Sequence, residues 1–454
     1  MLGDYRIQGR RATEIAADVE RAVAAGELEP GQTLPPLREL AGELAVNPNT
    51  VAAAYRLLRD RGVIETAGRK GSRIRPRPVT THRDRVRPAV PPGAHDLAAG
   101  NPDPALLPPL GPALAVAPAA ADRRPVLYGD PAADAGLLEL ARASFEADAL
   151  APGALAVTAG ALDAIARELA GRLRPGDAVA VEDPGWASLL DLLPAHGLRA
   201  VPVALDEAGP RPEAVAAPLA GGARALIVTN RAQNPTGAAL TAERAAELRA
   251  VLAGHPATLL IEDDHGHGIT ELPFAPLSCD PDRRPVTAHW VVIRSMAKAF
   301  GPDLRVAVLT GDQETVDRLL GRQRLDTGWV SHLLQQATAE LWRTDAAPLA
   351  KVAGAYRERR EALLAALAGH GIAATGGSGV NVWVPVAEET AVVVGLLQRG
   401  WAVSPGAGFR LQAPPGIRIT VARLPAERAP QLAADLAAVL SAVRGGSGGG
   451  SRQI

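Results

Sequence analysis

The chain has little cysteine and few aromatic residues. Cys279 is the one cysteine among 454 residues, which excludes a disulfide framework and a cysteine-based zinc site. Aromatic residues make up only 3% of the chain, so a core must be built from Ala, Leu and Val. No apolar run reaches the roughly 18 residues that a membrane span needs, and residues 1–11 are polar and basic. We therefore expect a cytoplasmic protein that has no signal peptide and does not enter a membrane.

Lysine is also scarce. The 48 basic residues comprise Lys70, Lys298 and Lys351 and, by subtraction, 45 arginines. Chemistry that requires a primary amine on a side chain therefore has three candidates.

The charge of the chain is unevenly divided. The formal net charge is -1, but residues 1–87 hold 16 basic and 11 acidic residues, a net of +5. The remainder holds 32 basic and 38 acidic residues, a net of -6. A small basic head on a large acidic body suggests that the head meets a polyanion, although chance drift in an arginine-rich sequence would look the same.

Length and patterning divide the chain into domains. Its 454 residues, 47% hydrophobic and 21% charged, indicate two or three globular domains. Residues 76–95 carry five prolines and four arginines and are expected to be a linker. We predict a DNA-binding domain over 1–75, this linker, a body over 96–443 and a flexible Gly/Ser tail over 444–454.

The head shows the pattern of a winged helix-turn-helix. Apolar spacing predicts helices over 12–25, 37–44 and 48–61, and two short strands joined by a glycine-containing hairpin. Asn47 is a natural N-cap and Pro48 a natural first residue for the third helix. That helix can enter the major groove while the basic hairpin touches phosphates. The residues expected to contact DNA are Arg38, Asn49, Thr50, Arg56, Arg69 and Lys70. The alternative is a three-helix module that binds protein.

The body alternates strands with helices. Short apolar runs at 178–181, 225–228, 258–261 and 290–293 predict strands buried on both faces of a mostly parallel sheet, so we expect an α/β fold. Asn234, Asp263 and Lys298 each follow one of these strands. Ligands of open parallel sheets bind beyond the carboxyl ends of the strands. A lysine with a carboxylate and an amide nearby is what a Schiff-base cofactor needs.

The head resembles the DNA-binding domain of the GntR superfamily. The resemblance covers about residues 12–75 and rests on four motifs in order: the PG-x-x-LP turn, R-E-L-A in the second helix, N-T-V at the start of the third, and G-R-x-G in the wing. It implies that the head binds operator DNA.

The body resembles the fold type I aminotransferases that use pyridoxal 5′-phosphate (PLP). The matching motifs run in order through residues 96–443 and are A-G-N-P-D, Y-G-D-P, T-A-G-A-L, E-D-P-G-W, N-P-T-G, E-D-D-H and S-M-A-K. The resemblance implies PLP as the cofactor. Each motif alone is more often structural than functional, but their joint order together with the scarcity of lysine favours a cofactor site.

The resemblance assigns roles around the cofactor ring. Lys298 would form the Schiff base, Asp263 would pair with the pyridine nitrogen, and Asn234 would donate to the ring oxygen. Trp186 would stack on the ring. His265 stands where most relatives have a tyrosine, and it would still reach the ring oxygen.

The resemblance also assigns the phosphate and substrate ends. The residues expected around the phosphate are Gly160, Ala161, Leu162, Ser295, Arg305 and Tyr128 of the partner subunit. Leu162 replaces a residue that is commonly polar in the family. Arg418 would clamp a substrate carboxylate, and Gly100 belongs to a substrate-side loop. His267 suggests a metal ligand, but no other ligand has matching spacing, so we expect no metal site.

A GntR-type head joined to an aminotransferase-like body is the architecture of the MocR regulators, which this chain resembles over almost its whole length. Within that group, E-D-D-H and the run from Arg294 to Arg305 are similar to the PtsJ branch, which is linked to control of vitamin B6 salvage. The resemblance implies a homodimer whose body senses PLP or an amino-compound effector. A working aminotransferase with a vestigial head, and a DNA-binding protein without cofactor, remain alternatives.

Overall fold

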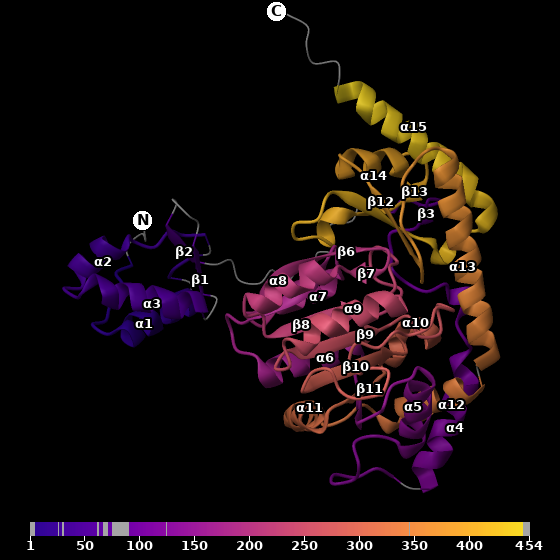
Figure 1. Cartoon of the computed structure of the whole chain (residues 1–454), viewed down its shortest axis with the longest axis horizontal. Helices are drawn as coiled ribbons and strands as arrows, with labels where there is room; N and C mark the ends of the chain where they lie inside the picture. Colours follow the sequence, from indigo (N-terminus) through magenta and orange to yellow (C-terminus); the bar gives the residue numbers. More distant parts are fainter. Residues whose placement is uncertain are drawn as a thin grey trace, which may run out of the picture. The chain divides into compact units, whose positions relative to one another are not determined.

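The computed structural model describes residues 5–25, 27–29, 31–60, 63–66, 71–74, 90–123, 125–344 and 346–447. The described residues form an N-terminal domain and a larger body (Figure 1). The wing residues Arg69 and Lys70, most of the predicted linker and residues 448–454 of the predicted tail lie outside the described residues. No helix in the described part of the chain is both long and apolar enough to cross a membrane.

The N-terminal domain has three helices followed by a hairpin, as predicted. The elements are α1 (Ala12–Ala25), α2 (Leu37–Glu43), α3 (Pro48–Asp60), β1 (Ile64–Thr66) and β2 (Ser72–Ile74). The strands pair antiparallel, with Ile64 opposite Ile74. Both isoleucines are buried in the domain's own core. This arrangement confirms the winged helix-turn-helix fold.

Helix α3 begins and packs as its sequence predicts. The side-chain oxygen of Asn47 accepts a hydrogen bond of 2.9 Å from the backbone N–H of Asn49, which caps the helix. The side chains that α3 buries are Val51, Ala54, Tyr55 and Leu58. Asn49 and Arg56 are exposed on the opposite face, and Thr50 is half-buried. In α2, Leu37 is exposed at the first turn, while Leu40 is buried.

One large sheet organises the body. In the described body its eight strands lie in the order β4 (Ala154–Thr158), β11 (Ala307–Gly311), β10 (His289–Ser295), β9 (Leu259–Asp264), β8 (Ala225–Thr229), β5 (Ala178–Asp183), β6 (Arg199–Asp206) and β7 (Gly209–Pro210). Strands β8, β9 and β10 run parallel, and β11 runs antiparallel to β10. The four apolar runs identified in the sequence are β5, β8, β9 and β10, which confirms the predicted α/β fold.

Helices pack around this sheet and build one end of the body (Figure 1). They are α4 (Leu110–Arg123), α5 (Ala135–Ala147), α6 (Ala161–Arg172), α7 (Ala187–Ala195), α8 (Pro212–Ala220), α9 (Ala242–Ala253), α10 (Ala297–Phe300), α11 (Gln313–Leu325) and α12 (His332–Thr344). Short 3-10 helices span Pro104–Leu106 and Pro302–Leu304. Because helices cover both faces, the strands can be apolar throughout.

A smaller lobe follows the sheet in sequence. It contains the antiparallel strands β12 (Asn381–Pro385), β15 (Gly416–Thr420) and β14 (Ser404–Pro405), with β13 (Trp401–Ala402) paired to β3 (His95–Asp96). Its helices are α13 (Ala346–Gly369), α14 (Glu389–Leu397) and α15 (Ala429–Ser447), and its 3-10 helices are Gly406–Gly408, Val421–Arg423 and Ala426–Arg428. Two expected boundaries move: β3 starts inside the predicted linker, and α15 continues past residue 443.

Candidate functional site

Parallel strands bring the predicted chemical groups to one edge of the sheet. Asp263 lies near the end of β9 and Ser295 at the end of β10, and Lys298 follows in α10. Asn234 lies in the loop after β8, and the peptide bond that joins it to Pro235 is cis. In the parallel pairing of β9 with β10, Ile293 lies opposite Asp263, so the two strands end at the same edge of the sheet. The carboxyl ends of these strands therefore form the expected ligand edge.

The lysine side chain faces the loop that holds Gly100. Lys298 is half-buried, and its Nζ donates a hydrogen bond to the carbonyl oxygen of Gly100. An ideal Cβ on Gly100 would lie 3.4 Å from Nη1 of Arg418. The structure thus places Lys298, Gly100 and Arg418 around one volume, although they are far apart in the sequence.

Arg418 joins the small lobe to the large sheet. It projects from β15, is 1% exposed, and donates from Nη1 to the side-chain oxygen of Asn234 at 3.0 Å. Its Nη2 donates to the carbonyl oxygen of Ala98 at 2.5 Å, and its guanidinium lies 4.5 Å from the ring centroid of Phe409. A guanidinium held in a fixed plane can recognise a carboxylate with two parallel hydrogen bonds.

The carboxylate of Asp263 has one committed oxygen and one open oxygen. Oδ2 lies 2.9 Å from Nδ1 of His265. Oδ1 is buried and has no hydrogen-bond partner within the described residues. Asp263 also lines a small cavity with Gly185 and Trp186. A buried carboxylate oxygen without a donor is costly, so the site fits a ligand that brings a ring N–H to it, as the pyridinium of PLP does.

His265 lies differently from expectation. Its Nδ1 faces the Asp263 carboxylate, and its Nε2 lies 2.7 Å from the carbonyl oxygen of Ala232. Both partners are acceptors, so both ring nitrogens must carry a proton. Burial opposes the charged ring, but the Asp263 carboxylate outweighs it, and the pKa of His265 is raised. Both ring nitrogens of His265 thus have partners within the described residues, and its contact with the cofactor ring oxygen stays a prediction.

We predict that His265 is an imidazolium at pH 7, where an ordinary histidine of pKa about 6.5 is mostly neutral. The measurement is ¹⁵N NMR of the histidine rings in the cofactor-free protein, with His265→Asn identifying the resonance by its loss. We expect both nitrogens of that ring to be protonated. A ring that is neutral at pH 7 would contradict this hydrogen-bond geometry.

The residues expected at the phosphate also meet. Gly160 has a φ of +99°, and α6 begins at the next residue, so backbone N–H groups of Ala161 and Leu162 lie at a helix N-terminus. Nη2 of Arg305 donates to the carbonyl oxygen of Ala159 at 2.6 Å. A Cβ on Gly160 would come within 2.8 Å of that Nη2, so glycine leaves room for the guanidinium.

Ser295 and Tyr128 are the other two residues expected at the phosphate. Ser295 is buried, and its hydroxyl accepts a hydrogen bond from the backbone N–H of Ala297 at 3.3 Å. Tyr128 is 95% exposed and meets the ring of Trp329 edge-on, with ring centroids 5.5 Å apart. That exposure is compatible with a role in a partner subunit.

Sequence reasoning missed two buried residues at this edge. Gln233 donates to Glu182 at 3.2 Å and to the carbonyl oxygen of Pro184 at 2.9 Å. Glu182 lines the cavity that contains Asp263, and burial raises its pKa to about 7. The available signal was an acid placed directly after the apolar run that forms β5.

The two aspartates at the end of β9, Asp263 and Asp264, have different surroundings. Asp264 lies against Arg231, at 2.8 and 3.0 Å, and against Nε of Arg294 at 2.8 Å. Burial alone would raise the pKa of Asp264, but these two guanidinium groups overcome it and hold that pKa below its usual range. Asp264 is therefore a structural ion-pair partner, while Asp263 faces the ligand edge.

His267 is buried beside this cluster. Burial and the nearby Arg294 lower the pKa of His267 to about 3, so the ring is neutral at pH 7. It meets the ring of Trp342 edge-on at 5.4 Å between centroids. Within the residues that the structure describes, no group of three or more His, Cys, Asp or Glu side chains is placed to hold a metal ion.

Comparison with known families matches both parts of the chain. Residues 96–436 match the family described as aminotransferase class I and II, and residues 11–74 match the bacterial regulatory proteins of the gntR family. Members of the first family depend on PLP.

Two curated regulators are similar to this chain. The vitamin B6 salvage pathway transcriptional repressor PtsJ of Salmonella typhimurium is 40% identical over 435 residues, covering 95% of this chain and 98% of the relative. The HTH-type pyridoxine biosynthesis transcriptional regulator PdxR of Corynebacterium glutamicum is 32% identical over 60% of each chain.

A solved structure shares the fold of the body. The α-aminoadipate aminotransferase LysN of Thermus thermophilus, complexed with N-(5′-phosphopyridoxyl)-L-leucine, aligns with a TM-score of 0.68 over 81% of this chain and 96% of its own, at 22% identity. The family matches, the full-length similarity to PtsJ and the shared fold agree. The chain belongs to the aminotransferase class I and II family and carries a gntR-family head, which is the MocR architecture.

Proposed function

We propose that this protein is a DNA-binding transcription regulator whose aminotransferase-like body binds PLP and responds to PLP or to an amino compound. The observation that carries the proposal is the joining of a winged helix-turn-helix to a body in which Lys298, Asp263 and Asn234 meet at one sheet edge. The similarity to the B6-related regulators PtsJ and PdxR supports it.

The residues of the ligand edge fit PLP. When bound, PLP supplies an aldehyde that condenses with an amine and a ring that withdraws electrons. Lys298 provides the amine of the body, and the open oxygen of Asp263 provides the acceptor for the ring nitrogen. Arg305 and the N-terminus of α6 provide the positive end for the phosphate.

His265 determines which oxygen of Asp263 is open to the cofactor. Its Nδ1 lies 2.9 Å from Oδ2, whereas the buried Oδ1 has no hydrogen-bond partner within the described residues. Oδ1 is therefore the oxygen proposed to accept from the ring N–H of PLP.

The exposed side of the N-terminal domain supplies the DNA contacts. Arg38 and Arg56 are exposed on α2 and α3, and Asn49 is exposed at the start of α3. In helix-turn-helix proteins the N-terminal residues of the second helix of the motif reach base edges, while arginines contact phosphates. Asn49 is thus the candidate for base contacts and Arg56 for phosphate or base contacts.

A second copy of the chain is the proposed partner of the body. Tyr128, Leu127 and Leu325 are 95, 65 and 82% exposed, respectively. The segment that holds the first two packs on the start of α12, where the side chain of Gln335 accepts from the backbone N–H of Asp134 at 2.8 Å. Large side chains left this exposed are the proposed contacts with the second copy. A monomer in sedimentation velocity at micromolar concentration would contradict the dimer.

The experiment that tests the proposal is a DNA mobility shift with fragments near the protein's own gene, with and without PLP. We expect PLP to change the affinity of the wild type, and Lys298→Ala to lose the response. Arg56→Ala should weaken binding about tenfold under both conditions, because a lost arginine contact costs about 1–3 kcal/mol.

Arg284→Ala removes the same charge from an exposed site in the body and is the matched control. DNA affinity that is unchanged by PLP would exclude coupling between body and head. The rival function, an active aminotransferase, predicts continuous turnover of an amino acid and an oxo acid at about 1–1,000 per second. A single half-reaction without turnover would exclude that rival.

A further inference from the structure

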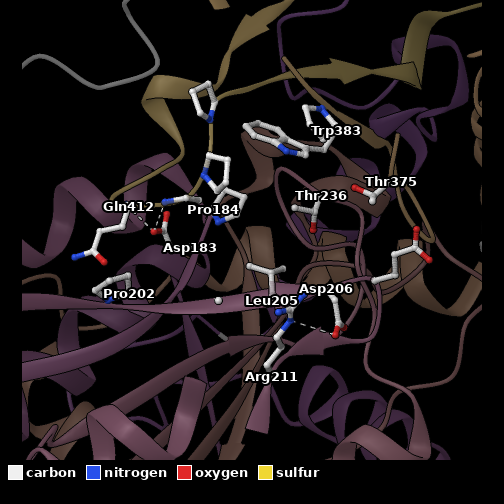
Figure 2. Close-up of a pocket in the computed structure, with 16 residues that line it drawn as sticks. Asp183, Pro184, Pro202, Leu205, Asp206, Arg211, Thr236, Thr375, Trp383 and Gln412 are labelled. Atoms are coloured by element: carbon white, nitrogen blue, oxygen red, sulfur yellow. Dashed lines mark hydrogen bonds and ion pairs between the residues drawn. The ribbon is translucent and has the colours of Figure 1, made fainter. Parts of the chain in front are cut away.

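A separate pocket of about 610 Å³ lies between the large sheet and the small lobe (Figure 2). Strand β6 contributes Leu205 and Asp206 on one side, and the small lobe contributes Thr375 and Trp383 on the other. The loop after β5 and residues 412–415 close a third side. Its volume lies in the range of about 300–1,000 Å³ that small-molecule sites occupy, and sites of this kind often lie between lobes.

The wall of the pocket is apolar and rigid. Trp383 is 7% exposed, and its indole sits against the backbone of the glycines beside it: a Cβ on Gly416 would lie 2.2 Å from Cζ2 of Trp383. The prolines that line the pocket are Pro184, Pro202, Pro385, Pro414 and Pro415. A rigid wall of one indole and several prolines favours a flat ring, which loses little entropy when it packs there.

The charges at the pocket favour a cation. Asp206 accepts two hydrogen bonds of 3.0 Å from Arg244, and this pairing outweighs burial and lowers the pKa of Asp206, so the carboxylate is ionised at pH 7. Arg211 lies 3.6 Å from the same carboxylate. Glu207 is exposed in the lining, and no ion pair within the described residues engages its carboxylate.

Asp183 adds a third carboxylate to the lining, held by backbone N–H groups of Leu411, Gln412 and Ala413 at 2.7–2.8 Å. The lining thus holds three carboxylates and the Arg211 guanidinium, and Asp206 is already paired with Arg244 outside the lining. Because Glu207 is the uncommitted charge, an ammonium is attracted and a phosphate or carboxylate is repelled.

Buried hydrogen bonds connect this pocket to the ligand edge. Gln233 donates to the carbonyl oxygen of Pro184 at 2.9 Å and accepts from the hydroxyl of Thr236 at 2.6 Å. Pro184 and Thr236 both line the pocket. The same Gln233 donates to Glu182, which lines the cavity of Asp263. A movement of the loop that holds Pro184 or of the loop that holds Thr236 therefore displaces Gln233, which is also bonded to Glu182 at the cavity of Asp263.

Ring packing provides a second connection. Trp383 packs with Phe409 in one buried cluster, and Phe409 lies under the guanidinium of Arg418 at 4.5 Å. Trp383 and Arg418 are also opposite each other in the pairing of β12 with β15. A displacement of the Trp383 indole therefore moves the Phe409 ring, and with it the guanidinium of Arg418.

We propose that the pocket between β6 and the small lobe binds a small aromatic ligand that carries an ammonium cation, and that its occupancy alters the PLP site. The binding itself is independent of the proposed function, whereas the coupling rests on PLP binding by this protein. A ligand that contacts both lobes stabilises the arrangement of the lobes that fits it best.

The test uses three probes that share an indole ring and differ in charge: N,N,N-trimethyltryptammonium, 3-methylindole and indole-3-acetate. The quaternary amine cannot condense with PLP, so it reports on the pocket alone. By titration calorimetry on the full chain we expect the cation to bind at least about tenfold more tightly than the anion, with the neutral ring between them. Absence of binding by the cation, or equal affinity for the anion, overturns the proposal.

The variant Glu207→Gln tests whether the cation binds in this pocket. It should weaken binding of the cation about three- to tenfold and leave 3-methylindole unchanged, because only the charged probe uses the carboxylate. Glu213→Gln, an exposed acid in the first turn of α8, is the matched control and should change neither. Unchanged affinity for the cation in Glu207→Gln overturns the assignment to this pocket.

Coupling is measured as the affinity for PLP with and without saturating trimethyltryptammonium. Reciprocity requires that PLP and the cation change each other's affinity by the same factor, which we expect to exceed about threefold. If PLP does not bind, the proposed cofactor is wrong while the cation titration still decides the pocket. If PLP binds with unchanged affinity, the coupling is wrong.

Discussion

Lys298→Ala is expected to abolish covalent attachment of PLP. After saturation with PLP, borohydride treatment and peptide mass mapping, the wild type should carry the cofactor at position 298 and the variant should carry none. The physical reason is that a Schiff base needs a primary amine beside the ring, and the chain offers three lysines in all. Asp263 and Arg305, the proposed contacts of the ring and of the phosphate, remain in the variant, so weaker, non-covalent binding should persist.

Lys351→Ala is the matched control. Lys351 lies exposed in α13, and its loss should leave the labelling at Lys298 intact. Label found on Lys351 or Lys70 in the folded, saturated protein would show that another amine forms the bond. Absence of any label in the wild type would remove PLP as a covalent cofactor of this protein.

Asp264→Asn is expected to destabilise the protein by about 3–5 kcal/mol. Asp264 is fully buried and pairs with Arg231 and Arg294, both also buried. The amide keeps the shape but removes the charge, so two guanidinium groups retain only Asp148 as a carboxylate partner among the described residues. Urea unfolding followed by circular dichroism measures the change in the free energy of unfolding.

The pH dependence of this difference has a definite sign. The pKa of Asp264 is lowered in the folded state, so its contribution is complete above the ordinary aspartate pKa of about 3.9 and is lost as the pH falls below it. Wild type and Asp264→Asn should therefore converge in acid. Asp282→Asn removes an exposed carboxylate paired with Arg284 at 3.7 Å and should leave the stability unchanged. Equal stability of wild type and Asp264→Asn at pH 7 would show that the ion pairs contribute nothing net.

The sequence alone was sufficient wherever a local pattern sets the structure. The four apolar runs became β5, β8, β9 and β10 because continuous β-rich segments are buried on both faces of a parallel sheet. Asn47 capped α3 because its side chain bonds a backbone group only two residues away. The meeting of Asp263 and Lys298 also followed, since the ends of adjacent parallel strands coincide.

The orientation of individual side chains could not be predicted from local sequence patterns. His265 was expected to face the cofactor ring oxygen, yet it lies between the Asp263 carboxylate and the Ala232 carbonyl. The position of that carbonyl depends on the loop after β8, where Ala232 has a φ of +59°. No periodicity in the sequence encodes such a contact, because it depends on one rotamer and one backbone turn.

The sequence by itself thus determined the two domain types and the mostly parallel sheet, because periodicity and motif order are properties of neighbouring residues. It also singled out Lys298 as the candidate amine. Only the tertiary structure decided that Arg418 bonds Asn234 across 184 positions, and that Gln233 bonds Pro184 and Thr236 of one pocket as well as Glu182 of another. Contacts of this range arise from the packing of the two lobes as a whole, in which each contact depends on many others.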